Sequence, residues 1–342
     1  MLVIIADDLT GALDTAAPFA ARGLYTEIAL TNEAVTGALA LKPDVLSINL
    51  ASREKPACEA YKTMRELMTY LPPAVRLFKK VDSRLKGNIS AELDAIEYRR
   101  ALVAPAIPAF GRFVRNGHVD GFGVETPICV ADALGRHAER STIAEAGTPE
   151  DLLSALDDCE GNGIDLLVGA RGLAEALADR MTHFAKAELV TPPAGQGLFV
   201  IGSHDRITDA QVEQLRQLQD VAYLPAPNGI VEPKGLLSSP AILVQATTGP
   251  STLRPEEVAH NLAQSVHPVL TSGARTMLLC GGATAEAVLA TMGVTSFQLK
   301  GECMPGLGLA YANGQCIILK SGGFGEPDTL KKLAEQLFDG RN

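Results

Sequence analysis

The sequence predicts an α/β protein with two domains, each built on a mainly parallel sheet. Apolar, strand-like runs alternate with segments of helical spacing along most of its 342 residues. This alternation is typical of βαβ units, in which helices connect parallel strands. The length suits two domains of roughly 150 residues each, and two prolines and two glycines interrupt the alternation in TPPAGQG at 191–197. We therefore expect domains at 1–192 and 193–342, with a cleft between them.

The first half contains predicted strands and helices in strict alternation. The strand-like runs lie at 1–6, 44–50, 76–82, 101–106 and 165–169. The helical segments lie near 11–22, 56–70, 89–99, 149–158 and 171–184. The helix at 149–158 has a defined start, because Thr148 suits the N-cap and Pro149 the first helical position.

The second half contains a further series of predicted strands and helices. Its strand-like runs lie at 198–202, 221–224, 241–246, 276–280, 296–300 and 315–320. Its helical segments lie at 208–219, 255–270, 284–292 and 327–338. Thr208 and Gln211 fit a capping box at the start of the first of these helices.

The composition argues against a nucleic-acid-binding protein. The formal net charge is -10, and no run of Lys and Arg exceeds two residues. Trp is absent and aromatic residues make up 5% of the chain, which leaves little surface for stacking bases. Because nucleic-acid binding normally needs a basic patch, we expect a small-molecule ligand instead.

The cysteines and the N-terminus predict a cytoplasmic protein. None of the six cysteines forms a CxxC pair, and the histidines show no zinc-binding spacing. In a chain of this length, reduced thiols are expected rather than a disulfide framework. The N-terminal apolar run is too short for a signal peptide or a membrane span, so no membrane association is expected.

The stretch IIADDLTGALDTA at 4–16 places two acids, Asp7 and Asp8, at the end of the first predicted strand. Ligands of open α/β sheets bind at the carboxyl ends of the strands, so these carboxylates are expected at the mouth of a site. The alternative is that they only cap the following helix, whose N-terminus favours negative charge. The residues alone leave both interpretations open.

A second cluster, FKKVDSRLKGNISAEL at 78–93, combines several cations with one acid before a helix. Its charged and polar members at the strand end include Lys79, Lys80, Asp82, Arg84, Lys86 and Asn88. Alternation along a strand puts the two adjacent lysines on opposite faces, so at least one of them needs a specific partner. Cations and amide donors at a helix N-terminus can hold a carboxylate or phosphate. A solvated loop with one ion pair is the alternative.

Two further strand ends carry arginines. Arg53 follows the strand in SINLASRE, and its planar fork suits a carboxylate. Arg112 follows Gly111 in VAPAIPAFGR, a segment that we interpret as a rigid turn.

Small-residue turns link three strands to three helices in the second half. They contain Ser203, Gly281, Gly282, Gly322 and Gly323. Thr284 is the expected N-cap of the helix after the second turn. Exposed turn amides and helix N-termini favour phosphates, while neither a Walker A motif nor GxGxxG occurs. Together the turns predict a nucleotide or polyphosphate site of another type.

The ordered set of motifs resembles the four-carbon acid sugar kinase family. The similarity extends over nearly the whole chain, and the set is more specific than any single motif. It rests on IADDLTGALDTA, SRE, FKKVDSRLKGNISAEL, APAIPAFGR, GARGLAEALA, GSHDRITDAQ, CGGATAEAVL and LKSGGFGEPD.

The resemblance implies an N-terminal acid-sugar-binding domain and a C-terminal ATP-binding domain. It implies phosphorylation of the terminal hydroxyl of threonate, erythronate or an oxo-tetronate, with ATP and Mg²⁺ as cofactors. By motif position, the substrate side would be lined by Asp7, Asp8, Arg53, Lys80, Asp82, Lys86 and Asn88. The ATP side would be lined by Ser203, Gly281, Gly282, Ala283, Thr284, Gly322 and Gly323.

We assign roles to these residues as hypotheses. Arg53, with Lys80 or Lys86, would clamp the substrate carboxylate and so fix the far hydroxyl. Asp8 or Asp82 would accept the proton of that hydroxyl, as an Asp does in protein kinases. No dedicated metal cage is visible, which suits Mg²⁺ because it usually takes only one or two carboxylates. The two domains would close to exclude water.

Other function classes stay open at this point. Ala283 stands where relatives usually have an acid, and Ala285 where they have a hydroxyl residue. These departures favour the alternative of a catalytically weakened member that binds an acid sugar or a nucleotide. A sugar-acid dehydrogenase is disfavoured by the missing dinucleotide fingerprint, and an aldolase by the lack of an isolated lysine in an apolar pocket. The stereoisomer and the oligomeric state are not fixed by the sequence, which is compatible with a homodimer.

Overall fold

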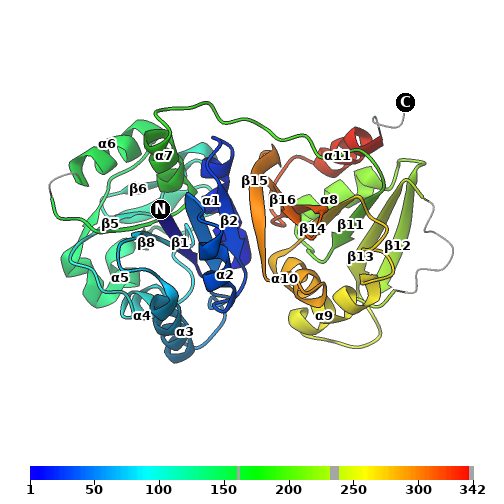
Figure 1. Ribbon diagram of the computed structural model, residues 1–342, viewed down its shortest axis with the longest axis horizontal. Coiled ribbons are helices and arrows are strands. Elements are labelled where there is room, and N and C mark those ends of the chain that lie inside the picture. Colours follow the sequence, from blue (N-terminus) through cyan, green and yellow to red (C-terminus); the bar gives the residue numbers. More distant parts are fainter. Residues whose placement is uncertain (160–161, 232–238, 339–342) are drawn as a thin grey trace. The chain divides into compact units, whose positions relative to one another are not determined.

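The computed structural model describes residues 1–159, 162–231 and 239–338 and divides the chain into two compact units (Figure 1). The first unit is Met1–Ala187 and the second is Glu188–Asn342. Each unit is a sheet with helices on both faces, so the predicted α/β class with mainly parallel sheets is confirmed. The boundary expected between residues 192 and 193 stays a prediction.

The sheet of the first unit is entirely parallel. Its strands, in spatial order, are β2 (Thr26–Ala29), β3 (Val45–Asn49), β1 (Leu2–Ala6), β4 (Arg76–Lys80), β10 (Leu166–Gly169), β5 (Ala101–Ala104) and β9 (Ser141–Ile143). Every residue of β1 and β3 is buried, because helices cover both faces and leave these strands no solvent side.

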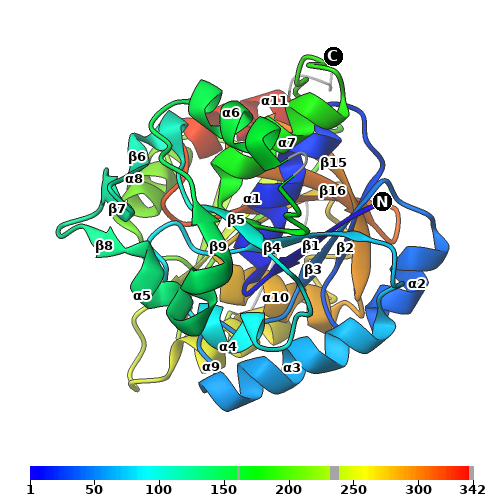
Figure 2. The same ribbon diagram turned by 90° about the vertical axis from the view of Figure 1, so that its left-hand side faces the viewer.

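Helices cover this sheet from both sides (Figure 2). On one face lie α1 (Leu9–Ala20), α6 (Pro149–Cys159) and α7 (Arg171–Met181). On the other lie α3 (Ala57–Tyr70) and α4 (Ile89–Leu93). The remaining elements are α2 (Ala34–Ala40), α5 (Val130–Leu134), short 3₁₀ helices at Pro108–Phe110 and Gly135–Arg140, and an antiparallel sheet of β6 (Arg112–Arg115), β7 (His118–Gly121) and β8 (Ile128–Cys129).

The strand order of the first unit reverses at β1. The chain runs from β1 to β2 and β3 on one side, and it then continues on the other side with β4. In open α/β sheets the crevice at such a reversal is the usual ligand site. The loops that follow β3, β1 and β4 contain Arg53, the acid pair and Asp82, so the fold gathers these predicted site residues at one edge.

The second unit has a mixed sheet. Its strands, in spatial order, are β12 (Val221–Pro227), β13 (Ala241–Thr247), β11 (Gly197–Ile201), β14 (Thr276–Cys280), β17 (Gln315–Lys320), β16 (Leu307–Ala312) and β15 (Ser296–Met304). Only β16 is antiparallel to its neighbours. Two helices, α8 (Arg206–Leu215) and α11 (Thr329–Phe338), cover one face, and α9 (Pro255–Val266) and α10 (Gly282–Thr291) cover the other (Figure 1).

The structure corrects one of the two helix starts predicted from capping residues and confirms the other. Helix α8 begins at Arg206 and is capped by Asp205, whose side chain accepts a hydrogen bond from the Ile207 amide. The capping box expected from Thr208 and Gln211 is therefore wrong, because both lie inside the helix. The start of α6 is confirmed, since it begins at Pro149 and the Thr148 hydroxyl accepts from the amide of Asp151.

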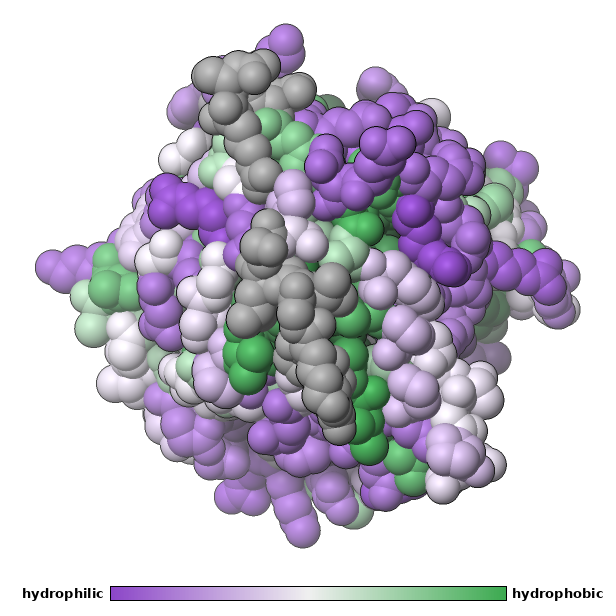
Figure 3. Space-filling model, turned by 90° about the vertical axis from the view of Figure 1, so that its right-hand side faces the viewer, coloured by the Kyte–Doolittle hydropathy of each residue, from purple (hydrophilic) through white to green (hydrophobic). Residues whose placement is uncertain are grey.

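Several short elements were missed by the sequence analysis. They include β2, α2, the edge strand β9 and the antiparallel strand β16. Among the described residues, no helix is both long and apolar enough to cross a membrane. Figure 3 shows a mainly hydrophilic face of the protein, with hydrophobic side chains confined to narrow strips.

Candidate active site

The acid pair of the first unit is bound by Arg53. The guanidinium donates from Nε to Asp7 Oδ2 (2.9 Å) and from Nη2 to Asp7 Oδ1 (2.8 Å). Its Nη1 donates to Asp8 Oδ2 at 2.6 Å and lies 4.0 Å from Asp82 Oδ2. One arginine from the end of β3 thus organises three carboxylates from the ends of β1 and β4. Its fork is already engaged, so its first role is to hold the acids together.

Asp8 also caps the following helix. Its Oδ1 accepts from the Gly11 amide at 2.8 Å, and its Oδ2 accepts from the Thr10 hydroxyl at 2.8 Å. A side chain on Gly11 would meet Asp8 Oδ1 at 2.5 Å, which explains the glycine in this first turn. Asp8 therefore caps α1, and both acids also pair with Arg53. The ligand site expected beside them stays a prediction.

The electrostatics keep Asp7 and Arg53 charged. Burial opposes ionisation of Asp7, but the Arg53 hydrogen bonds and the charges of Lys79, Arg53 and Lys80 outweigh it and lower the pKa of Asp7. Burial likewise opposes the charge of Arg53, but the hydrogen bond to Asp7 and the charges of Asp8, Asp7 and Asp82 raise the pKa of Arg53.

The adjacent lysines of β4 point to opposite faces and have different environments. Lys79 is 1% exposed, and its ammonium lies 2.8 Å from Glu92 Oε2 and donates to the Lys80 carbonyl at 2.8 Å. The other Glu92 oxygen accepts a hydrogen bond from Ser52, the neighbour of Arg53. Glu92 was not singled out in the sequence, because an acid in the first turn of a short helix normally faces solvent.

Lys80 lies on the side of the acid pair. It is 5% exposed, and a side chain on Gly11 would place its Cβ 3.1 Å from the Lys80 ammonium. Among the described residues, no hydrogen bond or ion pair engages that ammonium, although its charge lowers the pKa of Asp7. The side chain is largely buried beside the acids, so its ammonium is placed to attract a bound anion.

Asp82, Lys86 and Asn88 lie in the loop after β4 and differ in their contacts and exposure. Asp82 Oδ1 accepts from the Arg84 amide at 2.8 Å, and among the described residues its Oδ2 has only the 4.0 Å approach of Arg53. Asn88 donates to the carbonyls of Ser52 and Lys55 and so ties this loop to the loop of Arg53. Lys86 is exposed.

Arg112, which we interpreted as part of a rigid turn, reaches this loop. Its Nη1 donates to the Ser83 hydroxyl at 2.6 Å, and Nη2 donates to the Phe122 carbonyl at 2.7 Å. Burial and the neighbouring charge of Arg84 lower the pKa of Arg112, while Asp82 opposes the shift. Arg112, at the start of the small antiparallel sheet, thus adds a cation to the site. Its sequence context had indicated only a turn.

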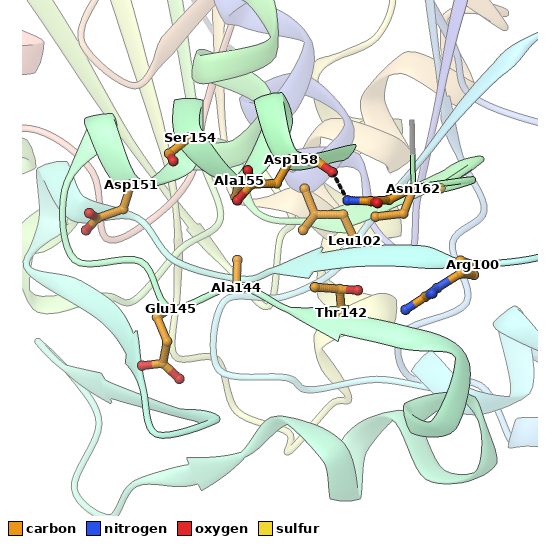
Figure 4. A pocket seen from close by; sticks show the side chains of 11 residues that line it. Arg100, Leu102, Thr142, Ala144, Glu145, Asp151, Ser154, Ala155, Asp158 and Asn162 are labelled. Carbon is orange, nitrogen blue, oxygen red and sulfur yellow. Dashed lines mark hydrogen bonds between the residues drawn. The ribbon is translucent and has the colours of Figure 1, made fainter. Parts of the chain in front are cut away.

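A pocket of about 440 Å³ in the first unit lies elsewhere (Figure 4). It opens between α6 and the edge strand β9, and its lining includes Glu145, Asp151 and Asp158. Glu145 and Asp151 already accept hydrogen bonds from backbone amides of neighbouring loops. None of the predicted site residues lines this pocket.

The predicted turns of the second unit follow three adjacent strands. Ile201 pairs with Cys280, and Cys280 pairs with Lys320, so β11, β14 and β17 end level with one another. A side chain on Gly322 would collide with the Ser203 hydroxyl, and one on Gly202 would collide with the Thr284 hydroxyl. The structure therefore brings all three turns together at one sheet edge, where the strand order reverses between β11 and β14.

Helix α10 begins within this group of turns. Its N-cap is Gly281, whose φ of 103° is a left-handed value that favours glycine. Thr284, the expected N-cap, is instead buried within the first helical turn, so that prediction is wrong. Gly282, Ala283 and Thr284 supply first-turn amides that lack intrahelical partners, and such amides are suited to an anion.

The comparisons with known proteins match these two units. A family model described as "Sugar-binding N-terminal domain" matches residues 2–123, and one described as "Nucleotide-binding C-terminal domain" matches residues 238–330. A D-threonate kinase of Bordetella bronchiseptica is 29% identical over 402 aligned positions, which cover 99% of this chain and 98% of the relative. A 3-oxo-tetronate kinase of Cupriavidus necator is 26% identical, with 98% and 97% covered.

The crystal structure of a Haemophilus influenzae protein of the DUF1537 family shares the fold, with a TM-score of 0.72 and 22% identity. It is matched over 98% of this chain and 100% of its own. The chain thus has two α/β units, one matched by a family model of a sugar-binding domain and one by a model of a nucleotide-binding domain. It belongs to the four-carbon acid sugar kinase family.

Proposed function

We propose that this protein is a kinase that transfers the terminal phosphoryl group of ATP to the terminal hydroxyl of a four-carbon acid sugar. The relatives named D-threonate kinase and 3-oxo-tetronate kinase support the reaction class and the substrate class. The structural observation that carries the proposal is the ammonium of Lys80 beside the acid pair: its side chain is largely buried, and no hydrogen bond or ion pair engages the ammonium among the described residues.

Lys80 would receive the substrate carboxylate. The Arg53 guanidinium already donates hydrogen bonds to Asp7 and Asp8. It is therefore less available to bind substrate than the sequence suggested. Within the described part of the chain no ion pair engages the Lys80 ammonium, so it can form a new one, and exposed Lys86 in the loop after β4 could approach the same anion. A carboxylate fixed at one end of a four-carbon chain determines where the far hydroxyl lies, and such positioning is a large part of phosphoryl-transfer catalysis.

Asp82 is better placed than Asp8 to accept the hydroxyl proton. Both oxygens of Asp8 accept strong hydrogen bonds, from the helix cap and from Arg53. In the described part of the chain one Asp82 oxygen has no contact beyond the 4.0 Å approach of Arg53, so that oxygen can still accept a hydrogen bond from substrate. A general base must reach the proton that it removes, and we therefore assign this role to Asp82.

The glycine turns of the second unit would hold the ATP phosphates. Helix α10 offers free first-turn amides, and Gly322 lies against Ser203. Among the described residues, no group of three or more His, Cys, Asp or Glu side chains is arranged to hold a metal. This fits Mg²⁺, which usually keeps waters and binds phosphates plus one or two carboxylates. Asp205 is the carboxylate beside this turn: a Cβ on Gly323 would lie 3.6 Å from its Oδ2. When bound, Mg²⁺ would neutralise phosphate charge.

A coupled assay of ADP release tests the proposal. The purified protein is given Mg-ATP and, in turn, D- and L-threonate, D- and L-erythronate, and 2- and 3-oxo-tetronate. Turnover with one of these acids establishes the reaction and names the substrate. No turnover with any of them, together with no rise in melting temperature on adding ATP, would contradict it and favour a protein that only binds an acid sugar.

A further inference from the structure

Three buried side chains hold the turn that follows β17 from within the second unit. Lys320 is 2% exposed, and Thr208 and Gln211 are fully buried. Lys320 comes from the last position of β17, while Thr208 and Gln211 are three residues apart on the same side of α8. They converge on residues 321–326, the segment that contains the glycines assigned above to phosphate binding.

All three side chains donate to backbone carbonyls of this turn. The Lys320 ammonium donates to the carbonyls of Ser321 (2.9 Å) and Gly322 (3.0 Å). The Thr208 hydroxyl donates to the Gly322 carbonyl at 2.7 Å. The Gln211 amide donates to the carbonyls of residues 324 and 326, at 3.0 and 2.8 Å. The carbonyls of the turn are therefore drawn toward the interior.

Drawing the carbonyls inward turns the adjacent amides outward. A trans peptide is planar, so its N–H points opposite to its C=O. The carbonyls of Ser321 and Gly322 face Lys320, and the amides of Gly322 and Gly323 consequently face away from it. In the described part of the chain neither amide donates a hydrogen bond to protein. Successive outward amides of this kind form an anion-binding concavity.

Lys320 also places a positive charge directly beneath the turn. No salt bridge engages its ammonium among the described residues, and its other contacts are Thr208 Oγ1 at 3.4 Å and Cys280 Sγ at 3.8 Å. Burial lowers the pKa of Lys320, while the neighbouring Cys280 and Asp205 oppose that shift. A turn that needed only mechanical support would be served by uncharged donors, since burying an ammonium is costly.

We propose that Lys320, Thr208 and Gln211 are positioning residues for the nucleotide phosphates. They fix the turn at 321–326 with its amides outward, and Lys320 adds attraction for the phosphates across the turn. The inference rests on the proposed function, because it assumes that the second unit binds ATP.

The inference is tested by measuring the affinity for Mg-ATP by calorimetry. The affinity for adenosine is measured in the same way, by its competition with Mg-ATP. Thr208→Val removes the hydroxyl with little change of shape, and Thr208→Ser restores it. Lys320→Met removes the charge, and Lys300→Met does the same at an exposed lysine of β15. We expect Lys320→Met to weaken Mg-ATP binding by roughly 30-fold and Thr208→Val by roughly 5-fold, in line with the loss of charge-assisted and neutral hydrogen bonds. Thr208→Ser and Lys300→Met should bind as the wild type does.

Adenosine distinguishes phosphate positioning from general damage. Its affinity should change by less than about twofold in every variant, because it has no phosphate for the turn to hold. Equal losses for Mg-ATP and adenosine, or unchanged Mg-ATP binding in Lys320→Met and Thr208→Val, would overturn the inference while leaving the kinase proposal intact. A wild-type protein that fails to bind Mg-ATP would overturn both. If Lys320→Met does not fold, the Thr208 pair alone decides.

Discussion

Arg53 binds Asp7 through two parallel hydrogen bonds, which its Nε donates to Oδ2 at 2.9 Å and its Nη2 donates to Oδ1 at 2.8 Å. Bidentate pairs of this kind are among the strongest polar contacts in proteins. The Asp7 side chain is 3% exposed, so its charge depends on this partner. The pair joins the ends of β3 and β1, and the remaining site residues are arranged around it.

Removing Arg53 should destabilise the protein strongly. Arg53→Met leaves the buried Asp7 carboxylate without its main partner, and breaking a buried pair in this way costs about 3–5 kcal/mol. Arg53→Lys retains a charge but loses the fork, so it should cost less. Urea unfolding measures both. An Arg53→Met protein within about 1 kcal/mol of wild type would show that the pair is not the structural centre of the site.

The stability conferred by Asp7 should be lost on the acid side. Its pKa in the folded state is lowered, so its contribution is fully present above the unfolded-state pKa of about 4 and declines as the pH falls toward the folded-state value. The free-energy difference between wild type and Asp7→Asn should therefore be constant near neutral pH and shrink below about pH 4. Urea unfolding across pH measures it, and a difference that grew on acidification would contradict the assigned ionisation.

The two adjacent lysines should respond oppositely to the same substitution. Lys79→Met leaves the buried Glu92 carboxylate without its cationic partner and should cost about 3–5 kcal/mol of stability. Lys80→Met should change stability by less than about 1 kcal/mol, because the lost attraction to Asp7 is offset by removal of a largely buried charge that no ion pair among the described residues neutralises. It should instead raise the KM for the acid sugar by roughly 100-fold, the scale of a lost charge pair with a ligand. An unchanged KM would exclude Lys80 as the carboxylate-binding residue.

Asp82 and Asp8 should separate catalysis from structure. Asp82→Asn should lower kcat by roughly 10²–10⁴, the usual contribution of a general base, while the melting temperature stays close to that of wild type. Asp8→Asn keeps a side-chain oxygen for the helix cap, so it should lose only about 1 kcal/mol, from the weakened pair with Arg53, and should retain the larger share of turnover. Steady-state kinetics with melting curves distinguish them. A larger loss of kcat in Asp8→Asn than in Asp82→Asn would assign the general base to Asp8 instead.

The neighbouring glycines 322 and 323 provide a test of the nucleotide side. A methyl group on Gly322 would collide with the Ser203 hydroxyl, whereas one on Gly323 meets Asp205 only at an ordinary contact distance. Gly322→Ala should raise the KM for ATP at least roughly 10-fold, equivalent to 1.4 kcal/mol, and should leave binding of the acid sugar unchanged. Gly323→Ala should be milder. Equal kinetics for the two variants would place the phosphates elsewhere.

The ends of buried parallel strands were predictable because their apolar runs stop at charged or small residues. Parallel strands share a carboxyl edge, so Asp7, Arg53 and Asp82 could be expected together, as could the glycine turns of the second unit. The two-residue-period pattern also predicted that Lys79 and Lys80 would separate. The α/β class followed from the same alternation.

What the sequence could not show depends on tertiary contacts. Arg53 appeared free for substrate until the structure showed its fork occupied by the acids. Glu92 looked like an exposed helix acid, although it pairs with Lys79 in the interior. Thr208 and Gln211 matched a capping pattern, yet the helix begins earlier and both side chains support a turn more than a hundred residues away. The short strands β2 and β9 have too few residues to give a periodic signal.

The most direct test of the central claim is the identity of the reaction product. Wild-type protein is incubated with Mg-ATP and the acid sugar that supports ADP release, and the product is examined by phosphorus NMR with coupling to protons. The account predicts one new phosphate ester whose phosphorus couples to the two protons of a terminal CH₂ group. Coupling to a single methine proton would contradict transfer to the terminal hydroxyl, and inorganic phosphate alone would contradict the kinase assignment.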